Sequence, residues 1–238
     1  MNKYESIANL LKQHIRDNTY PIGSLLPSQT DLADQFQVSR MTINKAINIL
    51  TMEGFVSAQR GFGTKIMNRP FWNKNVSPVD QYNGLSAEMR QLNRPIESQI
   101  IDFNVDFPDA DEQEHLTLTA QQPIYRIIRL RLVDHEPYLL EHTIMPVELV
   151  PNLTDEILHH SIYDYLQNKL GLQIAGAYRN IQAAKPDELD MKYLKCQPDD
   201  PVLEVAQMVY LKNGQPFEYS HSRNRYDKRS FTELNLRK

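Results

Sequence analysis

The chain has 238 residues, 41% hydrophobic and 24% charged, which suits one large domain or two small ones with a buried core. Its apolar runs are too short to span a membrane and its first residues lack the apolar stretch of a signal peptide, so we expect a cytoplasmic protein with no membrane partner. The single cysteine, Cys196, excludes an intrachain disulfide and a cysteine-based zinc site. The net charge of −4 at pH 7 gives the whole chain no general attraction to nucleic acid.

Three helices are predicted in the first 54 residues. Residues 4–18 place apolar side chains on one face, and Pro21 and Gly23 end that pattern. Ser28, as an N-cap, and Asp31 begin a second, short helix that ends near Gln37. Ser39 is placed to cap a third helix, and Gly54 closes it. The apolar positions of the third helix are Ile43, Ala46, Ile47 and Leu50.

The opposite face of this third helix is polar and basic. Arg40 flanks it and Thr42 lies in its first turn, and its outward residues are Met41, Asn44, Lys45 and Asn48. Side chains of this kind contact base edges and phosphates in the major groove of DNA.

Two short strands, residues 55–58 and 64–67, follow as a predicted hairpin. Its loop reads Gln59-Arg60-Gly61-Phe62-Gly63. Gly61 and Gly63 permit positive φ and a close approach of the backbone to a phosphate or a minor groove, and Arg60 adds positive charge. Each helix alone is explained by an ordinary small core, but the three helices and the basic hairpin together predict a winged helix-turn-helix.

These residues resemble the N-terminal domain of the GntR family of bacterial transcription regulators. The matching motifs cover roughly the first 70 residues and are Tyr20-Pro-Ile-Gly23, Leu26-Pro-Ser28, Val38-Ser-Arg40, Gly54 and Arg60-Gly-Phe-Gly-Thr64. The resemblance implies DNA contacts from Arg40, Thr42, Gly61 and Gly63, with Ser39 and Arg60 in the matching motifs. Thr30 and Asn44 stand where members often have arginine. Asparagine pairs with adenine, so the operator is expected to be less rich in G than is usual for the family.

Charge divides unevenly along the chain. Residues 1–69 carry eight Lys and Arg against five Asp and Glu, a net +3, and the rest of the chain carries −7. The positive part is therefore the part that resembles a DNA reader. Because +3 is a modest charge, we expect a homodimer that binds double-stranded DNA at a palindromic operator.

Residues 70–81 are expected to form a linker, because they combine prolines with polar residues and show no periodicity. Phe71 and Trp72 are too apolar for a free linker and are expected to dock on a domain or across a dimer. The predicted organisation is a DNA-binding domain at 1–69, this linker, and an effector-binding and dimerisation domain at 82–238.

The second domain is predicted to be antiparallel α+β, since hairpin-connected strands alternate with a few helices. The expected elements are an alternating strand at 101–105, a helix at 109–116, a hairpin of 124–132 with 138–145, a helix capped by Ser161, a strand at 173–183, a helix from Pro186 to Leu194, and a hairpin of 202–211 with 216–222 across Asn213-Gly214.

This part resembles the effector domain of the HutC branch of the GntR family, the UTRA type, whose fold resembles chorismate lyase. The motifs, within roughly residues 82–231, are Arg129-Leu-Arg131, Glu136-Pro137, Glu141, Pro146, Ser161-Ile-Tyr163, Asn213-Gly-Gln-Pro216 and Glu218-Tyr-Ser220. The resemblance implies that the domain binds a small effector without turning it over.

Arg129 and Arg131 are one residue apart on a predicted strand, so both project from one face. Adjacent guanidiniums repel each other unless an anion lies between them, which points to a phosphate or carboxylate ligand. The alternative is a structural network in which they pair with Glu141 and Glu218, and the sequence favours neither.

Other candidate effector-binding residues complete this site. Ser86 stands at a predicted helix start, where free backbone amides suit a phosphate, although a plain N-cap is an equal explanation. Ser161 has the same two explanations. Hydrogen bonds to sugar hydroxyls are expected from Glu141, Glu218, Tyr163 and Tyr226.

We therefore expect a transcription regulator, a repressor released by a small anionic metabolite such as a phosphorylated sugar. An enzyme is disfavoured: the sequence has no GxSxG motif, no P-loop and no metal-ligand spacing among its seven histidines, and we expect no cofactor and no metal. A chorismate-lyase-like enzyme and a ligand-free dimerising scaffold stay open as alternatives.

Overall fold

The computed structural model describes residues 2–59, 61–68, 76–78 and 84–232. The chain divides into two compact units, Met1–Asn73 with Thr232–Lys238, and Lys74–Phe231. Within the expected linker only Val76–Pro78 is described; it forms strand β3, which pairs with β10 (Ser230–Thr232) in a two-stranded sheet. The expectation for Phe71 and Trp72 falls outside the described residues.

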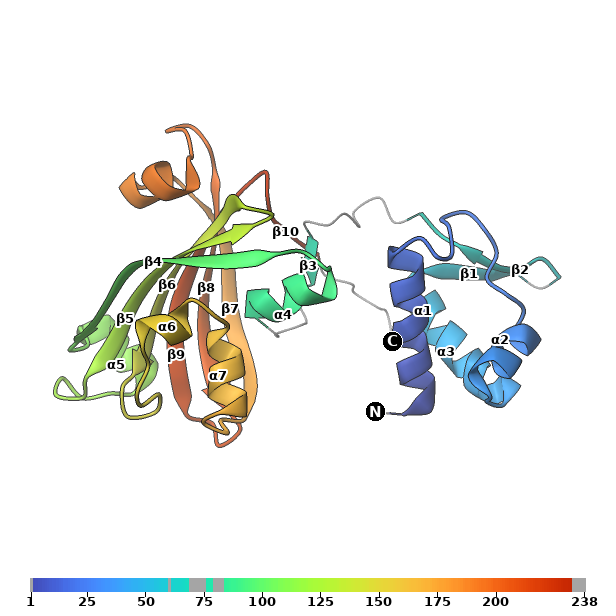
Figure 1. The fold of residues 1–238 in the computed structure, drawn as a ribbon, viewed down its shortest axis with the longest axis horizontal. Helices are drawn as coiled ribbons and strands as arrows, with labels where there is room; N and C mark the ends of the chain where they lie inside the picture. The colour runs from blue at the N-terminus through green and yellow to red at the C-terminus, as the bar shows by residue number, and fades with distance from the viewer. Residues whose placement is uncertain (1, 60, 69–75, 79–83, 233–238) are drawn as a thin grey trace. The chain divides into compact units, whose positions relative to one another are not determined.

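The first unit is the predicted winged helix-turn-helix. Helices α1 (Lys3–Arg16), α2 (Gln29–Phe36) and α3 (Arg40–Met52) are followed by the antiparallel strands β1 (Val56–Gln59) and β2 (Gly63–Ile66) (Figure 1). The chain before α2 adds a third segment beside β2, where the Leu26 amide donates to the Thr64 carbonyl at 2.8 Å and Leu25 bridges Lys65.

The turns of this unit follow the predicted caps. Ser28 accepts from the Asp31 amide at 3.2 Å while the Asp31 carboxylate accepts from the Ser28 amide, which completes a capping box. Ser39 caps α3 by accepting from the Thr42 amide at 3.2 Å. Gly54 has φ of 71°, which a residue with a side chain adopts only with strain.

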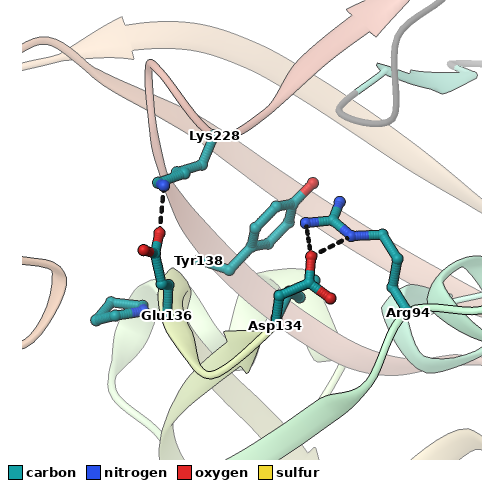
Figure 2. Close-up of a pocket in the computed structure, with 7 residues that line it drawn as sticks. Arg94, Asp134, Glu136, Tyr138 and Lys228 are labelled. Atoms are coloured by element: carbon teal, nitrogen blue, oxygen red, sulfur yellow. Dashed lines mark hydrogen bonds and ion pairs between the residues drawn. The ribbon is translucent and has the colours of Figure 1, made fainter.

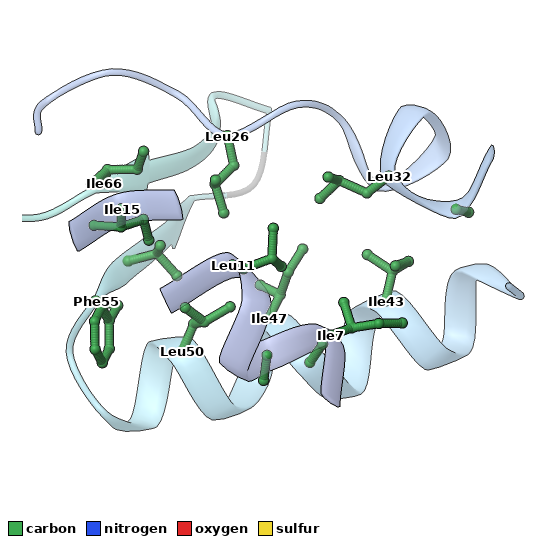
Figure 3. Close-up of a cluster of buried hydrophobic side chains, with 14 residues drawn as sticks. Ile7, Leu11, Ile15, Leu26, Leu32, Ile43, Ile47, Leu50, Phe55 and Ile66 are labelled. Atoms are coloured by element: carbon green, nitrogen blue, oxygen red, sulfur yellow. The ribbon is translucent and has the colours of Figure 1, made fainter. Parts of the chain in front are cut away.

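One hydrophobic core holds the three helices and the wing together. Figure 3 shows side chains from α1, α3 and both wing strands converging on it, including Leu11, Leu50, Phe55 and Ile66, each no more than 2% exposed. Because the apolar face of α3 packs against this core, its polar face is exposed to solvent.

The second unit is built on one antiparallel sheet of six strands in the order β4-β5-β6-β9-β8-β7. The strands are β4 (Ile96–Asp106), β5 (Ile124–Val133), β6 (Glu136–Pro146), β7 (Ile174–Ala184), β8 (Val202–Leu211) and β9 (Pro216–Arg225). The helices are α4 (Gly84–Gln91), α5 (Ala110–Leu116), α6 (Asp155–Leu158), α7 (Ile162–Asn168) and the short η1 (Asp190–Leu194). The α+β class and the two predicted hairpins are confirmed.

Alternation along the strands gives the sheet two different faces. On one face, α6 and α7 pack on residues such as Ile127, Met145 and Val209. On the other face, Leu194 of η1 packs with Leu130 and the buried thiol of Cys196. Figure 1 shows α6 and α7 side by side against one face of the sheet.

The structure differs from the sequence expectations in four elements, two of which are β3, inside the expected linker, and β10. The helix expected from Pro186 to Leu194 is a π-helix over Asp190–Leu194, with Lys195 in the left-handed region at its end. The four-residue helix α6, capped by Thr154, was not expected. The four residues of α6 are too few for a 3.6-residue period to be recognised in the sequence.

Candidate functional site

The two arginines of β5 lie on the same face, as predicted, and converge on one carboxylate. Arg129 and Arg131 are each 4% exposed. Oε2 of Glu141 accepts from Nη2 of Arg129 at 2.7 Å and from Nη1 of Arg131 at 3.3 Å. Glu141 reaches them because the register of β5 and β6 sets it directly opposite Arg129. The predicted alternative, a pairing of the arginines with Glu141, is therefore present in this structure.

Glu141 accepts only some of the hydrogen bonds that the two arginines can donate. Nη1 of Arg129 donates to the Leu158 carbonyl at 3.0 Å and to the His160 carbonyl at 3.4 Å, and Nη2 of Arg131 donates to Oγ of Ser86 at 2.7 Å. The Nε atoms of both arginines are buried without a hydrogen-bond partner among the described residues. Two guanidiniums share one carboxylate, which leaves a buried excess of positive charge.

Glu218 is the centre of a neighbouring polar cluster rather than an arginine partner. Its Oε2 accepts from the Tyr163 hydroxyl at 2.6 Å, and its Oε1 accepts from Nε2 of Gln207 at 2.9 Å and from Oγ of Ser220 at 2.7 Å. Glu218 is 3% exposed. The expected hydrogen bond from an arginine to Glu218 is not among the interactions of the described residues.

Burial and charge shift the pKa values of this site in different directions. Burial raises the pKa of Glu218 to about 7, because it outweighs the hydrogen bonds from Ser220 and Gln207. Burial also lowers the pKa of Arg129 to about 10. For Glu141, burial raises the pKa but the two arginines lower it further, so the net shift is downward. Glu141 is therefore ionised at neutral pH, while Glu218 is divided between its two protonation states.

Helix α4 places Ser86 beside the arginines, and its first residue, Gly84, packs tightly against the ring of Tyr163. Gly84 has φ of 71°, and a Cβ at this position would lie 3.1 Å from Cδ2 of Tyr163. A side chain there would displace the tyrosine that donates to Glu218. The beginning of α4 is thus fitted against the same polar cluster.

The structure brings together most of the predicted effector-binding residues. Ser86, Arg129, Arg131 and Glu141 form one hydrogen-bonded cluster, and Tyr163 and Glu218 belong to the neighbouring one. Ser161 begins α7, where its Oγ accepts from the Asp164 amide at 3.2 Å, next to the His160 carbonyl that Arg129 contacts. Tyr226 is 54% exposed, and no hydrogen bond joins it to either cluster in the described part of the chain.

Gln207 and Ser220 belong to the site, and the sequence analysis did not select them. Nε2 of Gln207 donates to both Glu218 and Ser220, the latter at 3.0 Å. The register of the β8–β9 hairpin could have identified them, because it places Gln207 opposite Ser220. Ser220 lies two residues from Glu218 on the same face of the sheet.

The predicted DNA-contacting residues lie at the start of α3 and on the wing. Arg40, Asn44 and Lys45 are exposed on α3, whereas Ser39 and Thr42 are joined in its cap with their hydroxyl oxygens 2.9 Å apart. Gly61 and Gly63 have φ of 85° and 89°, as their wing positions predicted. Arg60 lies outside the described residues.

A separate pocket of about 270 Å³ opens beside the turn between β5 and β6. Figure 2 shows Tyr138 between two ion pairs, Lys228 with Glu136 and Arg94 with Asp134, the second at 2.8 Å. None of the predicted effector-binding residues lines it. The paired charges of its rim leave it no net preference for an anion.

Among the described residues, no group of three or more His, Cys, Asp or Glu is arranged to hold a metal ion. No helix of the described chain is long and apolar enough to cross a membrane.

Comparison with known proteins decides the family. The sequence pattern of the UTRA domain matches residues 91–229, and that of the bacterial regulatory proteins of the gntR family matches residues 3–66. The chain belongs to the GntR family, in its UTRA-containing branch. It is therefore a DNA-binding transcription regulator and not an enzyme.

Relatives of this GntR/UTRA regulator match it over almost its whole length. The HTH-type transcriptional regulator GmuR of Bacillus subtilis is 42% identical over 100% of both chains. The mannosyl-D-glycerate transport/metabolism system repressor MngR of Escherichia coli is 26% identical, covering 99% of this chain and 96% of its own. The crystal structure of the regulator YydK from B. subtilis superposes with a TM-score of 0.74 at 27% identity, over 98% of each chain.

Proposed function

We propose that this regulator is a homodimeric repressor that a small anionic metabolite, a phosphorylated sugar, releases from a palindromic operator. In this proposal residues 1–69 read DNA, and residues 82–238 bind the effector and dimerise. The observation that carries the proposal is the buried pair of Arg129 and Arg131, which shares a single carboxylate oxygen of Glu141.

The charge of the cluster supports an anionic ligand. Two buried guanidiniums share the one carboxylate of Glu141, and the nearby Glu218 is only partly ionised at neutral pH, so some positive charge is left over, and a buried charge without a partner is costly. The two Nε donors without partners in the described chain add unused hydrogen-bonding capacity. A phosphate supplies both the missing charge and acceptors for several N–H groups at once. The Ser86 hydroxyl and the beginning of α4 offer further donors beside Arg131.

The second cluster supports a polyhydroxylated ligand. Glu218, Tyr163, Gln207 and Ser220 present both donors and acceptors, which suits sugar hydroxyls that act as both. One relative is in keeping with this, since it is named as the repressor of a mannosyl-D-glycerate transport/metabolism system. A ligand with an anionic end and a hydroxylated end would engage both clusters.

A thermal-shift screen of the purified chain tests the effector proposal. The panel contains hexose 6-phosphates, the corresponding free hexoses and inorganic phosphate. We expect at least one hexose 6-phosphate to raise the melting temperature in a concentration-dependent way, since a ligand that binds only the folded state stabilises it. The free hexose is expected to give a smaller shift.

Two variants locate the binding. Arg131→Gln is expected to abolish the shift. Arg126→Gln, on the same strand but paired with Glu112 and Asp106 outside the cluster, is expected to retain it. The proposal is wrong if no phosphorylated sugar stabilises the protein while an unphosphorylated metabolite does, or if Arg131→Gln binds as the unchanged chain does.

A further inference from the structure

The tip of the wing exposes one large aromatic side chain. Phe62 lies between β1 and β2 and is 77% exposed, more than any other large hydrophobic side chain in the described ranges. The core of this unit is closed by other residues, such as Phe55, Val56 and Ile66, so Phe62 contributes nothing to it. A single exposed aromatic is common on proteins; the position of this one is what distinguishes it.

The residues on both sides of Phe62 have no side chains. Gly61 and Gly63 hold φ of 85° and 89°, and a Cβ placed on Gly61 would meet no atom within 4 Å. The ring of Phe62 is therefore flanked by two residues without side chains, and the Leu25 side chain lies beside Gly63, 3.7 Å from where a Cβ on that glycine would be. The minor groove of B-DNA is only about 6 Å wide, so a tip with one flat ring and bare backbone on either side fits it, whereas neighbouring side chains would obstruct entry.

The wing face beside the tip carries positive charge. Lys65 is exposed on β2, where it lies opposite Ser57 of β1 and bridges Leu25. An ammonium at this place is suited to a phosphate at the edge of the groove that the tip enters. Charge beside an apolar tip favours DNA over an apolar protein surface as the occupant.

We propose that Phe62 is an apolar wedge that enters the minor groove and partly unstacks one base step of the operator. Pyrimidine–purine steps, TA and CA/TG, unstack most easily, so Phe62 selects such a step at a fixed distance from the bases that α3 contacts. The selection acts through the deformability of DNA and needs no hydrogen bond to a base. This inference rests on the DNA-binding activity of the family and not on the identity of the effector.

Parallel selections from a duplex library with a randomised 24-base-pair centre test this role. The unchanged chain, Phe62→Ala and Phe107→Ala are each used to select bound DNA at one fixed salt concentration. Phe107 is a matched control, a phenylalanine of the second unit that is 58% exposed. We expect the unchanged chain and Phe107→Ala to enrich a pyrimidine–purine step flanking each half-site. Phe62→Ala is expected to enrich the half-sites without that step.

Binding measurements on the selected duplex give the second readout. Phe62→Ala is expected to weaken binding roughly 10-fold or more, the order expected for a buried phenylalanine side chain, and to leave the slope of affinity against salt unchanged. Lys65→Ala is expected to lower that slope by about one counterion. A 2-aminopurine placed at the selected step is expected to brighten with the unchanged chain, because unstacking relieves its quenching, and to stay dark with Phe62→Ala.

Three outcomes for Phe62→Ala, and a fourth for the unchanged chain, overturn the wedge. The first is that Phe62→Ala selects the same duplex with the same affinity. The second is that it weakens binding only by lowering the salt slope. The third is that it changes the mass of the free protein in light scattering, which would assign Phe62 to a protein contact. If the unchanged chain enriches no sequence, DNA recognition itself fails and the wedge with it. Because Phe62 is exposed, the melting temperatures of the free variants are expected to be equal.

Discussion

One carboxylate oxygen of Glu141 accepts hydrogen bonds from both buried guanidiniums. The charge balance of the second unit therefore depends strongly on this residue. Removing one partner of a buried ion pair leaves the other charge uncompensated. We expect Glu141→Gln to lower the free energy of unfolding by roughly 3 kcal/mol in urea titrations without ligand. An anion that occupies the arginines is expected to restore much of this loss.

Glu136→Gln is the matched control for that variant. Glu136 pairs with Lys228 on the surface, where its side chain is 63% exposed, and exposed pairs contribute little to stability because water screens them. If Glu141→Gln and Glu136→Gln are destabilised equally, the arginines do not depend on Glu141 for their charge balance.

Glu218 makes the stability of the second unit depend on pH near neutrality. Its pKa is about 7 in the folded chain and its ordinary value is 4.5, so the folded state binds a proton more tightly than the unfolded state. Stability is therefore greatest at low pH with respect to this group, falls as pH rises from about 4.5 to about 7, and changes no further above that.

Glu218→Gln is expected to remove this dependence. Unfolding titrations between pH 5 and pH 8 are expected to show a decline of about 1–3 kcal/mol for the unchanged chain and a smaller one for the variant. Equal slopes in the two proteins would assign the titration to another group.

At the scale of the element, the capping box of α2 is a local device with a measurable effect. Ser28 and Asp31 satisfy each other's backbone amides at the start of the helix. Ser28→Ala is expected to lower the thermal stability of the first unit by about 1 kcal/mol. Thr30→Ala, an exposed substitution in the same helix, is expected to change it by less than about 0.5 kcal/mol. Equal effects would mean that the cap contributes nothing.

The first unit was predictable from sequence almost residue by residue because its signals are local. Ser28, Ser39 and Gly54 mark helix ends by their own chemistry, and the apolar face of α3 follows from spacing alone. In the second unit, the hairpin turns and the shared face of Arg129 and Arg131 were predictable for the same reason.

What the sequence left out depends on contacts between distant segments. Gln207 joins the cluster around Glu218 only through the pairing of β8 with β9, whereas Ser220 stands in the motif Glu218-Tyr-Ser220 and was not singled out as a site residue. The choice of Glu141 alone as partner of the arginines depends on strand register, a tertiary property. The π-helix at Asp190–Leu194 stands where a proline-started α-helix was expected, since packing of Leu194 under the sheet overrides local preference.

At the scale of the whole molecule, the proposed function calls for two copies of the chain and a coupling between ligand and DNA. Light scattering is expected to give a mass of about twice 27.7 kDa for the free protein. With the selected duplex, a saturating hexose 6-phosphate that binds the arginine pair is expected to weaken DNA affinity roughly 5- to 150-fold, equivalent to a coupling of about 1–3 kcal/mol.

The coupling between sugar phosphate and DNA is reciprocal, so it can be measured from either ligand. The duplex is expected to weaken binding of the sugar phosphate by the same factor, measured by isothermal titration of the protein with and without DNA. A ligand that binds the second unit while leaving DNA affinity unchanged would mean that the two sites are thermodynamically independent.

The thiol of Cys196 is chemically unique in this chain, and it lies beneath η1, 5% exposed, with a pKa raised by burial. A thiol reagent can modify Cys196 only when the segment containing η1 moves away from the sheet. The rate of labelling therefore reports the opening of one defined part of the fold, and no engineered label is needed. Added effectors and duplexes can be ranked by how strongly they slow the reaction, including those that leave the overall melting temperature unchanged.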